Sequence, residues 1–448
     1  MMNLKVSIES LGCAKNLVDS EVMMGLLDQY NFQLTNDKYE ADIIIVNTCG
    51  FIEAAKQESI DTIVELGTLK KEGNCKLLVV SGCLAERYAK ELIKELPEVD
   101  AVIGTGNYPE IIKVIYDTLK GERIVKSGNI NIEISEDLPR VLSTPSYTAY
   151  LKIAEGCDNC CTYCIIPKLR GSYRSRKMEY ILKEAKDMVK KGVKEIILIA
   201  QDTSRYGVDL YGEFKLAELL RKLCKIEELK WIRLLYCYPD NVSDELINVM
   251  KEEDKICKYL DLPIQHCNNL ILKRMNRKTT KEHILYVINK LRQKISDIHL
   301  RTSLIVGFPG ETNEQFEELK EFIKHVKFDR LGVFSYSKEK DTPAAKFEDQ
   351  VPEEIKEERY DQIMNIQKEI SFQKNMEKIG NIYDILVEEK VEDEGLYIGR
   401  TAYDAPEVDG VVYFNTKKPI DFGDLVKVKI TDTLEYDLIG EILDESCE

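Results

Sequence analysis

Short apolar runs separated by helix-length segments constrain the fold of this chain more than any other feature of its sequence. Four such runs lie within the first 103 residues, and a stretch with helical periodicity follows each of them. Apolar runs that alternate with helices are typical of parallel strands that are buried on both faces. We therefore expect a doubly wound parallel α/β unit at the N-terminus. Its expected strands are residues 6–8, 43–46, 77–80 and 101–103, and its expected helices are residues 17–29, 53–66, 85–96 and 109–119.

A second series of apolar runs and amphipathic segments extends from residue 147 to about residue 337, after a proline-containing linker at 133–145. Its six strand candidates are too few for a closed eightfold barrel and predict a partial (β/α)6 barrel. Polar clusters follow the strands, at the carboxyl ends where such barrels carry their chemistry. The expected strands are residues 150–154, 195–200, 232–237, 259–264, 301–306 and 332–335, and the polar clusters are residues 201–203, 238–239, 265–267, 307–311 and 336–337.

The pattern changes after residue 350. Residues 351–378 combine helical periodicity with dense charge, which predicts a connecting helix. From residue 379 onward, short alternating strands with Gly and Asp turns predict a small all-β barrel. The expected strands of this barrel are residues 382–387, 397–400, 411–414, 425–430 and 438–442.

The composition excludes several classes of protein. Hydrophobic residues make up 44% and charged residues 32% of the chain, as in soluble globular proteins. No run of about 18 apolar residues is present, so we expect no transmembrane helix, and residues 1–10 indicate a strand rather than a signal peptide. Thirteen cysteines without a secretion signal indicate a reducing, cytoplasmic location, in which grouped cysteines bind metals or carry redox chemistry. The net charge of −16 argues against a general binder of polyanions.

Four cysteines lie within eight positions after the first strand of the second unit. A zinc site usually takes two separated Cys-x-x-Cys pairs, so this crowding disfavours a zinc knuckle or a disulfide. With the spacing Cys157-x3-Cys161-x2-Cys164, the loop offers three thiolates on a tight turn. Cys thiolates are the usual ligands of iron–sulfur clusters, and three ligands on a four-iron cluster leave one iron open to a substrate. The spacing Cys157-x2-Cys160-x3-Cys164 is also possible, which leaves Cys160 without an assigned role.

Three further cysteines follow strands of the N-terminal unit. Cys13, Cys49 and Cys83, here called the edge thiols, come after its first three expected strands, each with a neighbouring glycine. Since the carboxyl ends of parallel strands meet at one edge of a sheet, we expect the edge thiols to lie together there. A lone cysteine is usually a small buried apolar residue, but three at equivalent turns favour a second cluster. Cys75 precedes its strand, and the cysteines without metal spacing are expected to be packing or surface residues: Cys224, Cys237, Cys257 and Cys447.

Taken together, these features resemble the methylthiotransferase family of radical S-adenosylmethionine enzymes over essentially the whole chain. The cysteine loop carries the family signature, including the aromatic Tyr163 before its last cysteine. The resemblance implies an N-terminal domain with three cysteines (1–125), a radical core (140–370) and a C-terminal TRAM domain (376–448). The most similar branch of the family modifies ribosomal protein S-twelve of the small subunit, and the local matches are residues 10–21, 201–203, 263–266 and 400–410.

The resemblance implies a reaction that uses two 4Fe–4S clusters and S-adenosylmethionine. Cys157, Cys161 and Cys164, here called the loop thiols, would hold the cluster that cleaves S-adenosylmethionine to a 5′-deoxyadenosyl radical. The edge thiols would hold an auxiliary cluster that carries the sulfur, and a second S-adenosylmethionine would supply the methyl group. The acceptor would be the β-carbon of one aspartate in the ribosomal protein. The expected contacts to cofactor or substrate are Tyr163, Gln201, Asp202 and Arg301.

The implied partners are the ribosomal protein, an electron donor such as flavodoxin or ferredoxin, and a sulfur donor. Neither a membrane nor a stably bound nucleic acid is implied.

Residues 376–448 carry 19 acidic against 7 basic residues, and this net charge of −12 favours a basic protein over an RNA backbone. We expect Asp404, Glu407 and Asp409 to help capture that protein. A local basic face could still form from Arg400, Lys417, Lys418, Lys427 and Lys429. The alternatives are a transfer-RNA adenosine methylthiotransferase and a non-catalytic metal module that binds RNA through its barrel.

Overall fold

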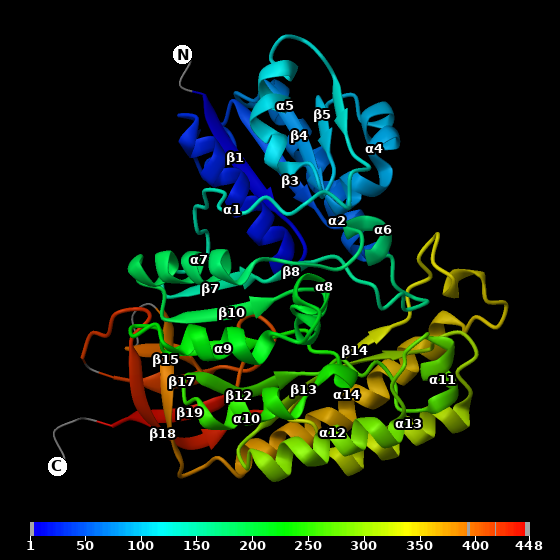
Figure 1. Ribbon diagram of the computed structural model, residues 1–448, viewed down its shortest axis with the longest axis vertical. Coiled ribbons are helices and arrows are strands. Elements are labelled where there is room, and N and C mark those ends of the chain that lie inside the picture. Colours follow the sequence, from blue (N-terminus) through cyan, green and yellow to red (C-terminus); the bar gives the residue numbers. More distant parts are fainter. Residues whose placement is uncertain (1–3, 392–394, 417, 444–448) are drawn as a thin grey trace.

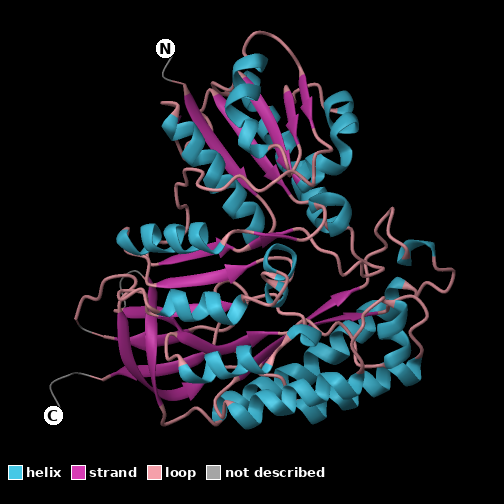
Figure 2. Cartoon of the chain, viewed as in Figure 1, coloured by secondary structure: helices cyan, strands magenta, loops and turns pink. Residues whose placement is uncertain are grey.

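The computed structural model describes residues 4–391, 395–416 and 418–443, and these residues form two parallel sheets and a barrel (Figure 1). The N-terminal sheet stands at one end of the molecule, the core sheet lies in the middle, and the barrel packs against the core far from the N-terminal sheet. Figure 2 shows that helices flank both parallel sheets, whereas the barrel consists of strands and loops. The expected fold class is confirmed.

The N-terminal sheet has the strand order β2-β1-β3-β4-β5-β6, and all its pairings are parallel. Ile43 and Ile45 of β3 face the apolar core beneath α1 and α5, whereas Ile44 and Val46 face the core beneath α2 and α4. The elements are β1 (Lys5–Ser10), α1 (Ala14–Gln29), β2 (Gln33–Leu34), β3 (Ile43–Thr48), α2 (Glu53–Gly67), α3 (Leu69–Glu72), β4 (Leu77–Gly82), α4 (Cys83–Glu95), β5 (Ala101–Ile103), α5 (Ile111–Thr118) and β6 (Ile124–Lys126).

The core sheet runs in the order β14-β13-β12-β11-β10-β7 and remains open, so it is the expected partial barrel. All six strands are parallel, and an apolar core packs the flanking helices against them. The elements are β7 (Thr148–Lys152), β8 (Ala154–Glu155), α6 (Ile166–Arg170), β9 (Arg174–Ser175), α7 (Met178–Lys190), β10 (Glu195–Ile199), α8 (Val208–Tyr211), α9 (Leu216–Cys224), β11 (Trp231–Leu234), α10 (Asp244–Glu252), β12 (Ile256–Asp261), α11 (Asn269–Arg274), α12 (Lys281–Lys294), β13 (His299–Val306), α13 (Asn313–Val326) and β14 (Arg330–Ser335).

The long helix α14 (Glu353–Met376) connects the core to a closed five-stranded barrel with the strand order β15-β16-β17-β19-β18. The strands of the barrel are β15 (Ile382–Lys390), β16 (Leu396–Thr401), β17 (Val412–Asn415), β18 (Leu425–Thr433) and β19 (Leu438–Ile442). Short 3-10 helices complete the chain at Tyr108–Glu110, Thr203–Arg205, Pro239–Asn241 and Ala344–Lys346. Within the described residues, no helix is both long enough and apolar enough to cross a bilayer.

Two helices begin earlier than the apolar pattern predicts. Helix α1 begins at Ala14, directly after Cys13, and α4 begins at Cys83 itself. The first turn of α1 contains Lys15 and Asn16, which are buried in contacts with other loops rather than against the sheet. Hydrophobic periodicity could not reveal such a turn, because its buried side chains are polar.

Buried ion pairs join the barrel to the core. Glu195 of β10 bonds to Arg233 of β11 and to Arg400 of β16, and both arginines are fully buried. Leu386 and Ala405 of the barrel also enter the apolar cluster inside the partial barrel. The barrel therefore closes the end of the core opposite the carboxyl ends of its strands.

This packing corrects the expected roles of several charged residues. Asp404 is buried against Arg330, and the carboxylate of Asp409 accepts a hydrogen bond from the hydroxyl of Tyr259 at 2.7 Å. Neither carboxylate is therefore available to capture a partner. Glu407, by contrast, is exposed. Arg400 cannot belong to a basic surface, because Glu195 and Glu388 hold it in the interior. Lys417, which was expected in that surface, lies outside the described residues.

Candidate functional site

The edge thiols lie together at the carboxyl edge of the N-terminal sheet. Cys13 caps the N-terminus of α1, Cys83 is the first residue of α4, and Cys49 follows β3. In a sheet of this order, ligands bind where the order reverses, which is between β1 and β3. Cys13 and Cys49 flank that point, as the strand–turn pattern predicts.

Two glycines let the three loops approach one another. A Cβ added to Gly12, whose φ is +87°, would lie 2.7 Å from Cβ and 3.1 Å from Sγ of Cys49. A Cβ added to Gly50 would lie 2.9 Å from the backbone carbon of Cys83. The 2.7 and 2.9 Å distances are shorter than real Cβ contacts, so a side chain at either position would displace its neighbour. The space beside Cys49 is therefore kept free of side chains.

The three edge thiols differ in their acidity. Burial acts to raise the pKa of Cys13, but the charges of Lys15 and Arg170 and the backbone N–H of Asn16 outweigh it and lower that pKa. Burial raises the pKa of Cys49, and it raises the pKa of Cys83 to about 12. Buried thiols of this kind lose their protons on metal binding, because the thiolate is the ligand.

The loop thiols lie beyond the carboxyl end of β7, in a turn that other loops hold in place. The backbone N–H of Cys157 donates to the carbonyl of Gly171 at 3.0 Å, and the N–H of Cys164 donates to the carbonyl of Cys161 at 3.0 Å. Thr162 donates its N–H to the carbonyl of Met275 and accepts from the N–H of Ala344. Backbone hydrogen bonds to three other segments of the chain therefore hold the turn that carries the loop thiols.

Cys160 differs from its neighbours in the same turn. It is exposed and has a left-handed backbone with a φ of +52°, whereas Cys157, Cys161 and Cys164 are half-buried. Burial raises the pKa of Cys157 to about 12 and raises the pKa of Cys164 above its usual range. The spacing that includes Cys161 therefore groups the three sheltered thiols, and Cys160 points to solvent.

Helix α6 lies between the two sets of thiols. Ile165 follows the last loop thiol directly, and together with Leu169 it packs on Cys83. The hydroxyl of Thr105 in the N-terminal unit donates to the carbonyl of Leu169 at 2.5 Å. The segment that follows the loop thiols therefore packs on one edge thiol, across a buried interface between the N-terminal unit and the core.

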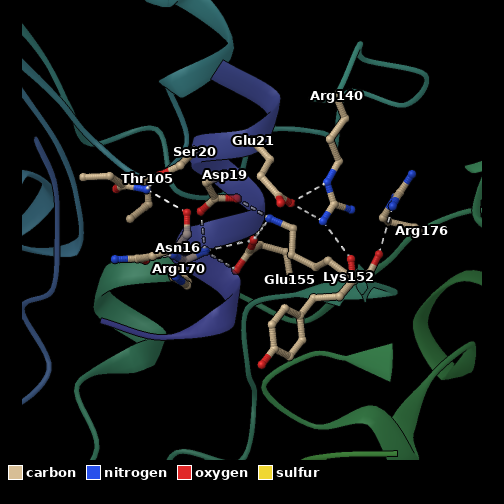
Figure 3. A network of polar contacts seen from close by, with 12 residues as sticks. Asn16, Asp19, Ser20, Glu21, Thr105, Arg140, Lys152, Glu155, Arg170 and Arg176 are labelled. Carbon is tan, nitrogen blue, oxygen red and sulfur yellow. Dashed lines mark hydrogen bonds and ion pairs between the residues drawn. The ribbon is translucent and has the colours of Figure 1, made fainter. Parts of the chain in front are cut away.

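A charged network fills the rest of that interface (Figure 3). Arg170 at the end of α6 donates to Asn16 at 2.5 Å and to both oxygens of Glu155 at 3.0 and 3.1 Å. Lys152 of β7 bonds to Asp19 of α1 at 2.5 Å and to Glu155 at 2.7 Å. Glu155 lies two residues before Cys157, so the network joins the start of the cysteine loop to α1.

A second ion-pair system holds the N-terminal unit near the end of β14. Glu339 accepts from Lys56 of α2 at 3.0 Å and from Arg87 of α4 at 2.9 Å, and its side chain is buried. Arg87 also donates to the carbonyl of Gly50, next to Cys49. Two separate systems of side-chain ion pairs therefore hold the N-terminal unit on the core.

The expected contact residues occupy different parts of the core. Tyr163 is half-buried beside the loop thiols, its hydroxyl accepts from Arg277 at 3.3 Å, and burial raises its pKa well above the usual range. Gln201 donates to Glu155 at 2.9 Å, and Asp202 accepts from Asn159 of the cysteine loop at 3.1 Å. Tyr163, Gln201 and Asp202 therefore lie around the loop.

Arg301 lies elsewhere, because its side chain pairs with Asp261 at 2.9 Å and with Asp409 of the barrel at 3.6 Å. The structure thus gathers three of the four expected contact residues at the loop and places the fourth at the interface with the barrel.

The surroundings of the loop thiols contain polar atoms without protein partners. Oε1 of Gln201 and Nε of Arg277 are buried and make no hydrogen bond in the described structure. Nearby, a hollow of about 200 Å³ opens beside Asn159 and Tyr238. Buried polar groups normally have partners, so these atoms fit a polar ligand held beside the loop.

All twelve cysteines in the described residues are free thiols, so no disulfide forms among them. In the same residues, no three His, Cys, Asp or Glu side chains converge closely enough to hold a single metal ion. The cysteine side chains are therefore too far apart for a zinc knuckle, in which all ligands bind one ion. In a four-iron cluster, by contrast, each thiolate binds a different iron atom. Cys224, Cys237 and Cys257 are buried packing residues as expected, and Cys447 lies outside the described residues.

Sequence reasoning did not identify Glu155, Arg170 and Arg277 as site residues. Glu155 and Arg170 flank the cysteine loop in the sequence, which is a usable signal, but charged loop residues give no indication of what they face. Arg277 lies more than 100 residues from the cysteine loop and reaches Tyr163 only through the fold.

Known proteins match the chain along most of its length. Residues 5–104 match Uncharacterized protein family UPF0004, residues 151–323 match the Radical SAM superfamily, and residues 379–443 match the TRAM domain. The ribosomal protein uS12 methylthiotransferase RimO of Clostridioides difficile (strain 630) is 56% identical over 442 residues, which cover 99% of each chain. The protein of the same name from Thermoanaerobacter sp. (strain X514) is 53% identical over 436 residues, which cover 97% of this chain and 99% of the relative.

Solved structures share the fold at low sequence identity. The radical S-adenosylmethionine methyltransferase TsrM of Kitasatospora setae aligns with a TM-score of 0.57 at 13% identity, over 77% of each chain. The cobalamin-dependent S-adenosylmethionine radical enzyme OxsB aligns with a TM-score of 0.50 at 14% identity, over 82% of this chain and 56% of OxsB.

Proposed function

We propose that this chain, which belongs to the RimO family of radical S-adenosylmethionine methylthiotransferases, transfers a methylthio group to ribosomal protein uS12. The full-length relatives are named for that substrate. The acceptor we propose is the β-carbon of one aspartate, where a C–H bond is replaced by a C–S bond that carries a methyl group. The reaction would take place in the cytoplasm.

The observation that carries this proposal is that two groups of three cysteines lie on either side of one interface, with the segment after the loop thiols packed on an edge thiol. Inserting sulfur at an unactivated carbon requires the radical source, the sulfur source and the substrate to be held together. Cys83 packs on the segment that directly follows Cys164, so the two sets adjoin. Ion pairs on both sides fix this arrangement.

The loop thiols would hold one 4Fe–4S cluster and the edge thiols a second one. The first cluster, when bound, supplies the electron that cleaves S-adenosylmethionine. Tyr163 packs beside the loop, and Gln201 has a buried oxygen without a protein partner that could bind the cofactor. Asp202 and Arg301 are committed to protein partners, so we assign them the task of orienting the surrounding loops and strands.

The surface of the barrel supports recognition of a basic protein. In the described part of residues 377–443, eight acidic residues are exposed against four lysines. The exposed acids are Glu377, Asp384, Glu389, Glu407, Asp421, Asp432, Glu435 and Glu441. Ribosomal proteins are generally basic, and such a surface would steer one toward the enzyme. An electron donor such as flavodoxin or ferredoxin and a sulfur donor complete the proposed partners.

We also propose that the chain divides into an N-terminal domain (1–125), a radical core (140–370) and a TRAM domain (376–448). Residues 127–147 form no strand or helix between the two sheets, and Glu377–Lys378 follow α14 directly. Within the first connection, Arg140 bonds to Glu21 of α1 and to Glu184 of α7, so this segment is held against both neighbours.

The test is mass spectrometry after one anaerobic reaction that contains the reconstituted chain, S-adenosylmethionine, a reductant, a sulfide source, uS12 and transfer RNA. We expect one aspartate of uS12 to gain a methylthio group and transfer RNA to remain unmodified. A methylthiolated adenosine without modified uS12 would replace this proposal with the transfer-RNA alternative.

Single replacements of the edge thiols separate the two clusters by role. Cys13→Ala, Cys49→Ala or Cys83→Ala should still release 5′-deoxyadenosine from S-adenosylmethionine but form no methylthio product. Normal product formation by these variants would mean that the edge thiols are buried packing residues, and the proposed auxiliary cluster would be excluded.

A further inference from the structure

We propose that Arg170 is a positioning residue that sets the charge around the edge thiols and thereby the reduction potential of the cluster they hold. The inference rests on the auxiliary cluster of the proposed function. Arg170 comes from the core, six residues after Cys164, yet it reaches across the interface to the N-terminal unit.

Arg170 approaches the edge thiols through Asn16. Its side chain is 2% exposed and donates to Oδ1 of Asn16 at 2.5 Å. The same oxygen accepts from Sγ of Cys83 at 3.7 Å. Asn16 itself donates to the carbonyls of Leu11 and Thr48, which lie just before Cys13 and Cys49 in the chain. The guanidinium therefore faces the point where all three cysteine loops meet.

The charges of the four-residue group around Arg170 are balanced before any cluster is considered. Two cations, Arg170 and Lys152, face two carboxylates, Asp19 and Glu155. Three thiolates would add negative charge beside this group, and an added electron would add more. A buried cation lowers the free energy of such an anion, because Coulomb interactions are strong away from water.

Arg170 differs from the other cation near the edge thiols. The ammonium of Lys15 lies over the ring of Tyr236, 3.3 Å from the centroid. The guanidinium of Arg170 instead donates to Oδ1 of Asn16, the atom that also accepts from Sγ of Cys83.

Arg170 also links the two sets of thiols mechanically. Its NH1 bonds to Glu155, which opens the cysteine loop, and helix α6 connects it to Cys164, which closes the loop. Other arginines of the same interface lack this link: Arg140 pairs with Glu21 and Glu184, and Arg176 pairs with Glu136 and Glu184. Arg140 is therefore a matched control for the loss of a buried interface cation.

The experiment measures the reduction potential of the auxiliary cluster alone. Full-length chain in which the loop thiols are replaced by Ala is reconstituted with iron and sulfide, and its cluster is titrated by electron paramagnetic resonance. Arg170→Gln should make reduction at least tenfold less favourable, which corresponds to a shift of 59 mV to more negative potential for one electron. Arg170→Lys keeps the charge and should remain near the parent, as should Arg140→Gln.

Each result decides a different point. An unchanged potential in Arg170→Gln, or an equal shift in Arg140→Gln, would overturn the role of Arg170. If Arg170→Gln loses the cluster, the Lys variant decides: retention of iron at the parent potential supports the proposal, and loss of iron from a folded Lys variant contradicts it. If the parent chain, with only its loop thiols replaced, binds no four-iron cluster, then the proposed auxiliary cluster does not exist. In that case the proposed role of Arg170 is wrong as well.

Discussion

At the scale of single residues, Gly12 decides whether the edge thiols can meet. Its φ of +87° and the 2.7 Å between an added Cβ and Cβ of Cys49 exclude a side chain. We expect Gly12→Ala to displace Cys49 and to lose about half of the bound iron, although all six cysteines remain. Iron analysis of the reconstituted chain measures this loss.

Gly121→Ala is the matched control for Gly12→Ala. Gly121 has a φ of +96°, and no atom lies within 4 Å of an added Cβ. The control therefore carries a similar backbone strain of about 1–2 kcal/mol without a clash. Equal iron contents in the two variants would show that the space beside Cys49 does not matter.

The loop cysteines provide a second test at this scale. Cys164→Ala should abolish the release of 5′-deoxyadenosine, because Cys164 is sheltered and belongs to the proposed ligand set. Cys160→Ala should leave that release unchanged, because Cys160 is exposed. Chromatographic measurement of 5′-deoxyadenosine distinguishes the two. Loss of release in the Cys160 variant would mean that the alternative spacing of the loop is the correct one.

The proposed ligands can be predicted from the sequence because each belongs to a repeated local pattern. Every edge thiol follows a strand, and the loop thiols lie in one short segment. The residues around them cannot be predicted in this way. Arg170 and Asp404 are both charged loop or helix-end residues, yet one reaches the edge thiols and the other is buried against Arg330. Their directions depend on how separate units pack.

At the scale of elements, Glu195 ties the barrel to the core through two fully buried arginines. Removing the carboxylate leaves Arg233 without its counter-charge and Arg400 with Glu388 alone, and breaking a buried pair typically costs about 3–5 kcal/mol. We expect Glu195→Gln to lower stability by that amount and to loosen strands β10 and β16 in hydrogen exchange. Glu213→Gln removes an exposed partner of Lys215 and should change stability by less than about 1 kcal/mol.

The same ion pairs predict an acid sensitivity. Although burial opposes it, Arg400 and Arg233 lower the pKa of Glu195 to about 2. A carboxylate whose folded pKa is depressed contributes stability above its unfolded pKa, and this contribution is lost as the pH falls toward the folded value. Thermal unfolding should therefore show a loss of stability between about pH 4.5 and pH 2 that is smaller in Glu195→Gln. Equal losses in both proteins would contradict this role of Glu195.

The strands were easier to predict than the helix starts. All strands of the core sheet can be predicted within a few residues, because each contributes apolar residues to the core beneath the flanking helices. The apolar pattern does not predict the starts of α1 and α4, because polar or cysteine residues lie in their first turns. Those turns place Cys13 and Cys83 at helix N-termini, where the backbone N–H groups favour a thiolate.

At the scale of the whole molecule, the exposed acids of the barrel predict a salt-dependent encounter with uS12. Asp432 and Glu441 are exposed on the neighbouring strands β18 and β19. Replacing both with Lys should weaken binding of uS12 by the full-length chain about tenfold at low salt, and the difference should shrink as salt screens the charges. Substrate-free cleavage of S-adenosylmethionine should not change.

Replacement of Glu65 and Glu72 with Lys makes the same charge change on the N-terminal unit and serves as the control. Calorimetric titration with uS12 measures both double variants. If the two weaken binding equally, net charge rather than the barrel surface steers the substrate.

The arrangement of the three sheets could not be derived from the sequence alone. The local repeat of apolar residues predicts each sheet. The interfaces between the sheets depend instead on single charged residues that lie far apart in the chain, such as Lys56 with Glu339 and Glu195 with Arg400. For that reason an isolated barrel is a poor test of substrate binding, since it would expose Arg400 and Asp404, which the full chain buries.

The two opposed sets of thiols are tested most directly by the iron content of three anaerobically reconstituted proteins. The unaltered chain should bind about eight irons, and about four should remain when either the edge thiols or the loop thiols are replaced by Ala. Each four-iron protein should keep the spectrum of one cluster. About four irons in the unaltered chain, with none lost when the edge thiols are replaced, would contradict the existence of a second cluster at the carboxyl edge of the N-terminal sheet.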